Sequence, residues 1–103
     1  MNYRSTRGNV KDALKSSDAV VQGLAPDGGL YVPVDFPKPA YELENLIQLP
    51  YQKLAQTILQ WFFNDYPAEQ LADGTTKAYA DQWDDDSIAP LSRQKAGFNY
   101  LEL

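Results

Sequence analysis

The chain has 103 residues, which suits one small domain that buries roughly two-thirds of the surface exposed by its unfolded form. A hydrophobic fraction of 44% and an aromatic fraction of 13% predict a packed core. Histidine and cysteine are both absent, which excludes Ser-His-Asp and Cys-His catalysis, thiolate zinc sites and disulfide bonds within this chain.

The net charge of −5 arises from fourteen acidic and nine basic side chains. Binding to a phosphate backbone requires clustered lysine and arginine, so nucleic acid is not expected as a partner. No apolar run approaches the roughly 20 residues that cross a bilayer, and the N-terminal residues lack the apolar core of a secretory signal. We therefore predict a soluble, cytoplasmic protein that does not contact a membrane.

The N-terminal part predicts a strand, a turn and a short helix. Residues 3–6 favour a short strand, and the glycine and asparagine within 7–9 indicate a turn. Residues 16–22 predict a helix that one of its two leading serines caps, with Asp18 in the first turn, where the helix dipole favours negative charge. Gly23 is suited to the position after the last helical residue because it adopts positive φ readily.

A second turn and strand come next along the chain. Proline, aspartate and two glycines within 25–29 predict a tight turn, and residues 30–32 predict a strand closed by Pro33. The prolines within 34–40 favour an extended connector, since proline denies ladder hydrogen bonds and disfavours helix in the residue before it. Residues 41–49 are compatible with a short helix.

The strongest periodicity predicts a helix that begins at Tyr51, with Pro50 in its first turn. Trp61 lies off the apolar stripe, so a second surface is expected to cover it. The stripe has the helical spacing of a core-facing side and consists of Tyr51, Leu54, Ala55, Ile58, Leu59, Phe62 and Phe63.

A further helix is predicted from Pro67, with Glu69 in its first turn and an end at the acidic run 84–86. Residues 88–91 and 98–101 then predict short strands. Together these elements predict an α+β domain with a few short strands and three to four helices. One face of the helix after Pro67 is expected to carry Leu71, Ala78, Tyr79 and Gln82.

Several polar motifs have both a functional and a structural interpretation. The acidic run 84–86 lacks the glycine and glutamate spacing of a calcium loop, which favours a solvated helix end. The glycine-rich segment 23–29 is followed by a strand and lacks the Lys-Ser/Thr of a Walker A loop, which favours a structural turn over phosphate binding. Residues 4–7, with two arginines and two hydroxyls, form an anion-binding candidate that competes with an ordinary exposed strand end.

The paired carboxylates Glu42 and Glu44 point in different directions on a helix and so do not form an acid–base pair. Nothing in the sequence combines a nucleophile, an oriented base and an oxyanion site. We therefore predict no catalytic, cofactor-binding or metal-binding residue in this chain.

The ordered segments resemble the N-terminal domain of threonine synthases. The similarity is carried by residues 3–8, by the twelve-residue segment 22–33, by the helices that begin near Tyr51 and Pro67, and by the strands 88–91 and 100–103. In that family the last strand leads into a Phe-His-Gly-Pro-Thr…Phe-Lys-Asp segment. The resemblance therefore implies the N-terminal domain of a fold-type II pyridoxal phosphate enzyme, covering residues 1–103, with the catalytic domains beyond it.

The family implies a pyridoxal phosphate lyase that converts O-phosphohomoserine and water into threonine and phosphate, the last step of threonine biosynthesis. Its Schiff-base lysine lies beyond Leu103, so this chain is expected to bind no cofactor and to be inactive alone. The implied partners are the catalytic domains of the same chain, with Trp61, Tyr79 or Trp83 as interface candidates. The lysines that do not match the family's lysine are Lys11, Lys15, Lys38, Lys53, Lys77 and Lys95.

Two alternatives concern the chain as an isolated unit. A free-standing interaction module would dock a partner through the aromatic helix 51–63. An autonomous anion-binding protein would use Arg4 and Arg7. We also hypothesise that the isolated chain exposes an apolar patch and forms a homodimer through it.

Overall fold

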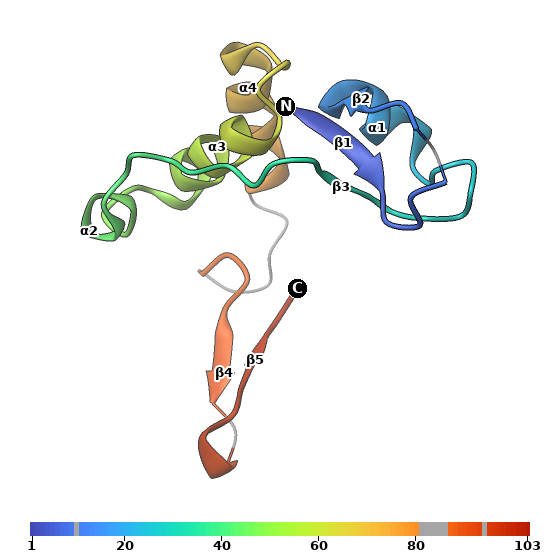
Figure 1. The fold of residues 1–103 in the computed structure, drawn as a ribbon. Coiled ribbons are helices and arrows are strands. Elements are labelled where there is room, and N and C mark those ends of the chain that lie inside the picture. Colours follow the sequence, from blue (N-terminus) through green and yellow to red (C-terminus); the bar gives the residue numbers. More distant parts are fainter. Residues whose placement is uncertain (10, 81–86, 94) are drawn as a thin grey trace.

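The computed structural model of the chain describes residues 1–9, 11–80, 87–93 and 95–103 (Figure 1). Within these residues, four α-helices combine with short strands in two separate sheets, which confirms the predicted α+β class. The elements are β1 (Asn2–Ser5), β2 (Leu14–Lys15), α1 (Ser16–Gln22), β3 (Tyr31–Pro33), α2 (Leu43–Leu46), α3 (Tyr51–Phe62), α4 (Ala68–Ala78), β4 (Leu91–Arg93), the short 3-10 helix η1 (Lys95–Gly97) and β5 (Asn99–Leu101).

The first sheet is antiparallel, with β1 between β2 and β3. Along β1 the side chains of Tyr3 and Ser5 are buried while Arg4 is exposed, as expected when alternate residues face opposite sides of a sheet. Tyr3 pairs with Pro33, which is tolerated because β3 lies at the edge of the sheet. The strands predicted over 3–6 and 30–32 are confirmed to within a residue or two.

Helix α1 begins at Ser16 as predicted, but the predicted serine cap is wrong. The capping position is occupied by Lys15, whose side chain makes no capping hydrogen bond. Instead, the Asp65 carboxylate, supplied by the loop between α3 and α4, accepts hydrogen bonds from the Ser16 hydroxyl and from the Ser17 N–H, the latter at 3.0 Å. A carboxylate suits this place because the first N–H groups of a helix have no partners within the helix.

The turn at Gly23 and the turn over residues 25–28 have the predicted glycine pattern. Gly23 ends α1 with φ of +74° and donates its N–H to the Ala19 carbonyl at 3.0 Å. In the next turn the Gly28 N–H donates to the Ala25 carbonyl at 2.8 Å, and Gly28 has φ of +78°. Both positions require positive φ, which glycine adopts without a Cβ penalty.

Helices α3 and α4 pack against each other, and each is preceded by a proline at the capping position. Pro50 and Pro67 therefore stand just before the first turn rather than inside it, a shift of one residue from the prediction. The apolar stripe of α3 is only half-covered, since Tyr51 and Ile58 keep 40% and 37% of their surface exposed. Trp61, which lies off this stripe, is half-buried.

Helix α4 ends at Ala78, earlier than the predicted end at the acidic run. Tyr79 leaves the helix with φ of −115°, and its carbonyl accepts a hydrogen bond from the Gln52 amide at 2.8 Å. The Tyr79 ring also meets the Tyr51 ring with centroids 4.9 Å apart. These contacts with α3 fix the position at which the last turn of α4 ends. Gln82, Trp83 and the acidic run 84–86 lie outside the described residues.

The second sheet is the β4–β5 hairpin, which stands apart from the body formed by the other elements (Figure 1). The strand predicted over 88–91 is wrong in position, because β4 begins only at Leu91. Ala89 has φ of +48°, which is incompatible with extended backbone, and Pro90 has no N–H for a ladder. The strand predicted over 98–101 is confirmed from Asn99 onward.

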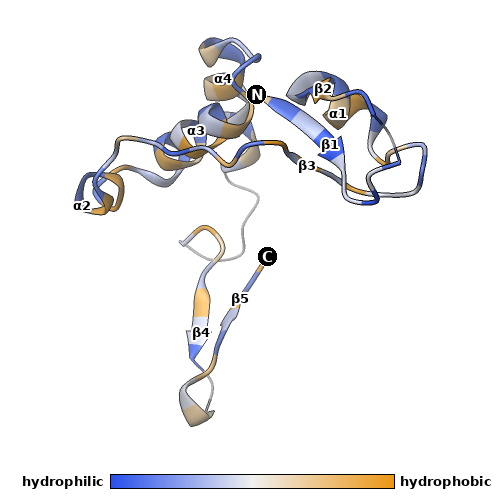
Figure 2. Cartoon of the chain, viewed as in Figure 1, coloured by the Kyte–Doolittle hydropathy of each residue, from blue (hydrophilic) through white to orange (hydrophobic). Residues whose placement is uncertain are grey.

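The core of the described chain is small. Its buried apolar side chains are Tyr3, Ala19 and Ala25, whereas much larger side chains remain exposed. Figure 2 shows apolar residues on α2 and at the start of β4, both away from the sheet of β1. The exposed apolar residues include Val20, Val21, Leu24, Leu30, Phe36, Leu43, Ile47, Leu91, Phe98 and Leu101.

Candidate functional site

The turn between α1 and β3 contains a hydrogen-bond cluster centred on the Asp27 carboxylate. Its Oδ1 accepts a hydrogen bond from the Ser5 hydroxyl at 2.6 Å and from the Gly29 N–H at 3.0 Å. Its Oδ2 accepts one from the Asn9 N–H at 3.1 Å. The carboxylate thus joins β1, the turn after β1 and the turn before β3.

The electrostatics of this cluster favour ionised aspartate. The Ser5 hydrogen bond, and then those from Gly29 and Asn9 and the charge of Arg7, lower the pKa of Asp27 below its usual value. The turn also needs a small residue at Gly29, because a Cβ there would lie 2.1 Å from the Ser5 hydroxyl oxygen. The polar groups of the cluster therefore bind one another, and little room remains for a ligand.

The anion-binding candidate, residues 4–7, lines a shallow hollow of about 350 Å³ together with Gly8 and Val32. The structure brings these residues together but engages most of their polar groups internally. Ser5 donates to Asp27, the Thr6 hydroxyl accepts the Leu30 N–H at 3.0 Å, and Arg7 donates to the Asp27 carbonyl at 2.9 Å. The arrangement favours a structural role for this strand end.

The glycine-rich segment 23–29 uses its backbone groups in the same way. The Ala25 N–H donates to the Gly29 carbonyl at 2.9 Å, and the N–H groups of Gly28 and Gly29 donate to Ala25 and Asp27. A phosphate cradle needs several N–H groups that converge on an empty site. These N–H groups already have partners, so the segment has the geometry of a structural turn.

A second cluster joins the sheet to the helical pair. The Tyr3 hydroxyl donates to the Phe62 carbonyl at 2.8 Å, and burial, followed by the charge of Asp65, raises the pKa of Tyr3. Desolvation raises the pKa of Asp65, but the hydrogen bonds from Ser17 and the charge of the N-terminal amine outweigh it, so this pKa is lowered overall. Tyr3 and Asp65 therefore hold α1 and β1 against the end of α3.

Two apolar hollows of about 350 Å³ each open on the body. One lies between α3 and α4 and includes Leu59, Leu71 and Tyr79. The other lies between α1, β1 and β3, where Phe63 forms one wall. Among the predicted interface residues, Trp61 and Tyr79 are half-buried, and the Trp61 ring centroid lies 5.9 Å from that of Tyr41.

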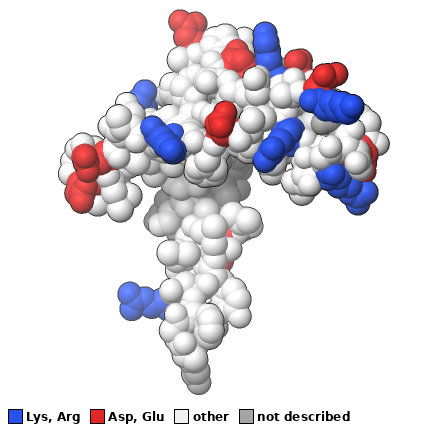
Figure 3. Space-filling view, in the orientation of Figure 1, with Lys and Arg blue, Asp and Glu red and all other residues white. Residues whose placement is uncertain are grey.

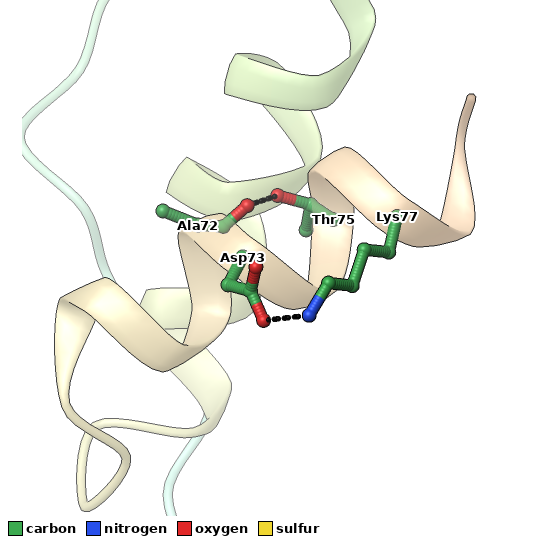
Figure 4. Close-up of polar contacts among 4 residues, drawn as sticks. All are labelled: Ala72, Asp73, Thr75 and Lys77. Atoms are coloured by element: carbon green, nitrogen blue, oxygen red, sulfur yellow. Dashed lines mark hydrogen bonds and ion pairs between the residues drawn. The ribbon is translucent and has the colours of Figure 1, made fainter.

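Charged side chains are distributed unevenly. Figure 3 shows them over the body that carries α1–α4, whereas most of the visible hairpin surface is uncharged. On α4 the Lys77 ammonium binds the Asp73 carboxylate at 2.6 Å, and the Thr75 hydroxyl donates to the Ala72 carbonyl at 3.1 Å (Figure 4). These contacts lie within one helix and support it rather than a ligand site. Among the described residues, no group of three or more acidic side chains is placed to hold a metal ion.

A protein-family profile described as "Threonine synthase N terminus" matches residues 2–79, more than half of the chain. The chain belongs to the threonine synthase N-terminal family. It is 42% identical over 80 residues to the threonine synthase of Methylobacillus glycogenes, a match that covers 77% of this chain and 17% of that protein. It is 35% identical over 108 residues to the threonine synthase of Pseudomonas aeruginosa, covering 100% of this chain and 22% of that protein.

The fold of this threonine synthase N-terminal domain is similar to a solved structure. The crystal structure of threonine synthase from yeast matches with a TM-score of 0.72 and 30% identity, covering 87% of this chain and 18% of the yeast chain. The chain spans about a fifth of the length of the curated relatives it matches. In the described part of the chain, no helix is both long enough and apolar enough to span a bilayer.

Membership of the threonine synthase family implies pyridoxal phosphate in the full-length enzyme. A Schiff-base lysine for that cofactor is typically desolvated and next to a phosphate site. Lys53 and Lys77 instead pair with neighbours on their own helices. The described lysines therefore do not fit a Schiff base to the cofactor. The lysines whose side chains are exposed are Lys11, Lys15, Lys38, Lys53 and Lys77.

Proposed function

We propose that this chain is the N-terminal domain, residues 1–103, of a cytoplasmic pyridoxal phosphate-dependent threonine synthase that converts O-phosphohomoserine and water into threonine and phosphate. The observation that carries the proposal is the family match over residues 2–79. The cofactor and the reacting lysine are then supplied by the domains beyond Leu103. The enzyme class of the parent is a carbon–oxygen lyase that acts on phosphates.

The proposed role of the domain is architectural, and none of its residues is proposed to touch the substrate or the cofactor. Two observations support this role. The polar groups best suited to chemistry, on Ser5, Arg7 and Asp27, are held by one another. The exposed apolar residues are numerous for a chain with so small a core, which suits a domain that packs against further protein.

A complementation experiment tests the proposed function. The full-length parent gene and the segment for residues 1–103 are each expressed in a bacterial strain that lacks threonine synthase. We expect growth without threonine from the parent gene only, and a pyridoxal absorbance band in the purified parent only. A parent protein that binds pyridoxal phosphate but makes no threonine would overturn the proposed reaction. Growth supported by residues 1–103 alone would overturn the architectural role.

One observation favours a second candidate, a free-standing interaction module that docks a partner through α3. Tyr51 and Ile58 of its apolar stripe keep 40% and 37% of their surface exposed. The two candidates differ in the reading frame beyond Leu103, because the module needs no catalytic domains. A stop codon directly after Leu103 supports the module, and a His-Gly-Pro-Thr…Lys-Asp segment supports the enzyme.

The exposed apolar residues of the chain also make the isolated chain a candidate homodimer. Light scattering over a range of concentrations tests this arrangement directly. We expect the apparent mass to rise with concentration. A single monomeric mass at every concentration would rule it out.

A further inference from the structure

The chain contains two aspartate–glycine pairs in different surroundings. Asp27–Gly28 lies in the turn before β3, and Asp73–Gly74 lies inside α4. An aspartate before glycine is prone to cyclise, because glycine has no Cβ to obstruct the approach of its backbone nitrogen to the preceding side chain. The reaction needs a glycine N–H without a partner, a carboxyl group that can turn toward it, and a proton on that carboxyl.

The cyclisation at Asp27–Gly28 is a dehydration. The backbone nitrogen of Gly28 forms a bond to Cγ of Asp27, and the bond between Cγ and one carboxyl oxygen breaks. That oxygen leaves as water, together with the carboxyl proton and the amide proton. Water then opens the resulting succinimide ring. Opening at Cγ restores aspartate, whereas opening at the main-chain carbonyl carbon of Asp27 gives isoaspartate, whose backbone continues through Cγ.

The folded turn withholds all three requirements. The Gly28 N–H already donates to the Ala25 carbonyl at 2.8 Å. The Asp27 carboxylate accepts hydrogen bonds from the Ser5 hydroxyl at 2.6 Å and from two backbone N–H groups at 3.0 and 3.1 Å. The Ser5 hydrogen bond is also the largest cause that lowers the pKa of Asp27, so the carboxylate stays ionised and resists attack. Cyclisation at Asp27 therefore requires the turn to open first.

The Asp73–Gly74 pair is protected in a different way. The Asp73 carboxylate is exposed and binds the Lys77 ammonium at 2.6 Å (Figure 4). The protection comes from α4 itself, because the regular hydrogen bonds of a helix engage the Gly74 N–H. Part of α4 must unwind before Asp73 reacts, whereas Asp27 is protected by contacts between β1 and a turn. The two pairs therefore report on the opening of two different regions.

We propose that Asp27–Gly28 is a modification site at which isoaspartate forms when the turn opens, and that this modification prevents the turn from closing again. Isoaspartate lengthens the backbone by one carbon atom and carries its carboxylate on a shorter arm, directly on Cα. The carboxylate then cannot reach the Ser5 hydroxyl and both N–H groups in the same register. The turn cannot shift to compensate, since even a Cβ on Gly29 would lie 2.1 Å from the Ser5 hydroxyl oxygen. This inference goes beyond the proposed function and does not depend on it.

Incubation of the 103-residue chain at mildly acidic pH tests where and when isoaspartate forms. One sample is folded and the other is unfolded in guanidinium chloride. Isoaspartate is located by fragmentation of proteolytic peptides in a mass spectrometer. We expect isoaspartate at Asp27 to form at least about 100-fold more slowly in the folded sample, since only rare openings expose the pair. Equal rates at Asp27 in the two samples would overturn the proposal.

Removal of the denaturant tests whether the turn closes again. Chains with isoaspartate at position 27 are separated by chromatography, returned to buffer and compared with unmodified chains by amide hydrogen exchange. We expect the Gly28 and Gly29 amides to lose at least about tenfold of their protection, because their partners in the turn are displaced. The Leu59 amide in α3 should keep its protection. Full protection of Gly28 and Gly29 would show that the turn closes around isoaspartate and would overturn this part of the proposal.

A substitution in the folded chain tests the protective role of the Ser5 hydroxyl. Ser5→Ala removes this donor, and Thr75→Ala removes a similarly buried hydroxyl from α4, since Ser5 and Thr75 keep 3% and 4% of their surface exposed. We expect Ser5→Ala to accelerate isoaspartate formation at Asp27 about tenfold, because loss of a hydrogen bond to a charged group lets the turn open more often. The rate at Asp73 should not change, and Thr75→Ala should leave the rate at Asp27 unchanged.

The two aspartates distinguish opening of the turn from general unfolding. An equal rise at Asp27 and Asp73 in Ser5→Ala, or no rise at Asp27, would overturn the protection by Ser5. The comparison of folded and unfolded samples uses the unmodified chain, so it tests the site even if Ser5→Ala does not fold.

Discussion

The N-terminal sheet and the C-terminal hairpin differ in where their interactions are completed. Around β1 the polar groups of Ser5, Thr6 and Asp27 all find partners within the same N-terminal region, and Tyr3 is buried. In the described part of the hairpin, the two strands pair with each other, and Leu91, Tyr100 and Leu101 remain exposed. The difference shows that a short chain can combine one self-contained unit, whose polar groups are paired within it, with one unit whose apolar side chains stay exposed.

The largest expected effect comes from Gly29→Ala, which places a Cβ 2.1 Å from the Ser5 hydroxyl oxygen. We expect a loss of about 2 kcal/mol or more in the free energy of unfolding, because the turn is too closely packed to adjust. Urea unfolding followed by tryptophan fluorescence measures it. Gly74→Ala is the matched control, since nothing lies within 4 Å of its Cβ and alanine favours a helix by about 1 kcal/mol. If both variants stabilised the chain, the turn would not be closely packed.

The next effect is that of Asp65→Ala, which removes the carboxylate that caps α1 from the loop between α3 and α4. We expect a loss of about 1 kcal/mol, the usual contribution of a cap. Asp18→Ala, in the first turn of the same helix, is the control and should cost less because Asp18 contributes only through the helix dipole. A larger loss at Asp18 would show that the helix dipole, and not the remote cap, stabilises α1.

Acid is expected to weaken the self-contained unit. The pKa values of Asp27 and Asp65 are lowered in the folded protein, so folding favours their ionised forms. Their contribution is present above the unfolded aspartate pKa of about 4 and is lost as the pH falls through the lower folded values. Thermal unfolding between about pH 7 and about pH 2 measures this loss. Asp27→Asn should flatten the profile, whereas the exposed Asp35→Asn should keep it; identical profiles for both variants would contradict the assignment.

The smallest effect is expected for Leu101→Ala in the isolated chain. Leu101 keeps 57% of its surface exposed, so its truncation should change the free energy of unfolding by less than about 0.5 kcal/mol. Tyr3→Phe, in the buried part of β1, gives the reference, because it removes the hydrogen bond to the Phe62 carbonyl at a cost of about 1 kcal/mol. A loss at Leu101 as large as that at Tyr3 would mean that the hairpin is already packed in the isolated chain.

The elements that could be predicted from the sequence are those whose cause is local. The positive φ of Gly23 and Gly28 and the starts of α3 and α4 after Pro50 and Pro67 depend on the residues themselves. The end of α4 and the position of β4 were predicted less well. In both cases one residue that breaks the regular pattern sets the boundary of the element. Tyr79 leaves α4 and packs against α3, and Ala89 adopts positive φ before β4.

The sequence by itself determined the family, the α+β class and the absence of histidine and cysteine chemistry, because these depend only on which residues are present and in which order. Only the tertiary structure placed Asp27 beside Ser5 and Asp65 at the start of α1, since each pair is separated by a long stretch of chain. Which donors a carboxylate contacts depends on how the whole backbone folds, and no local sequence pattern predicts this.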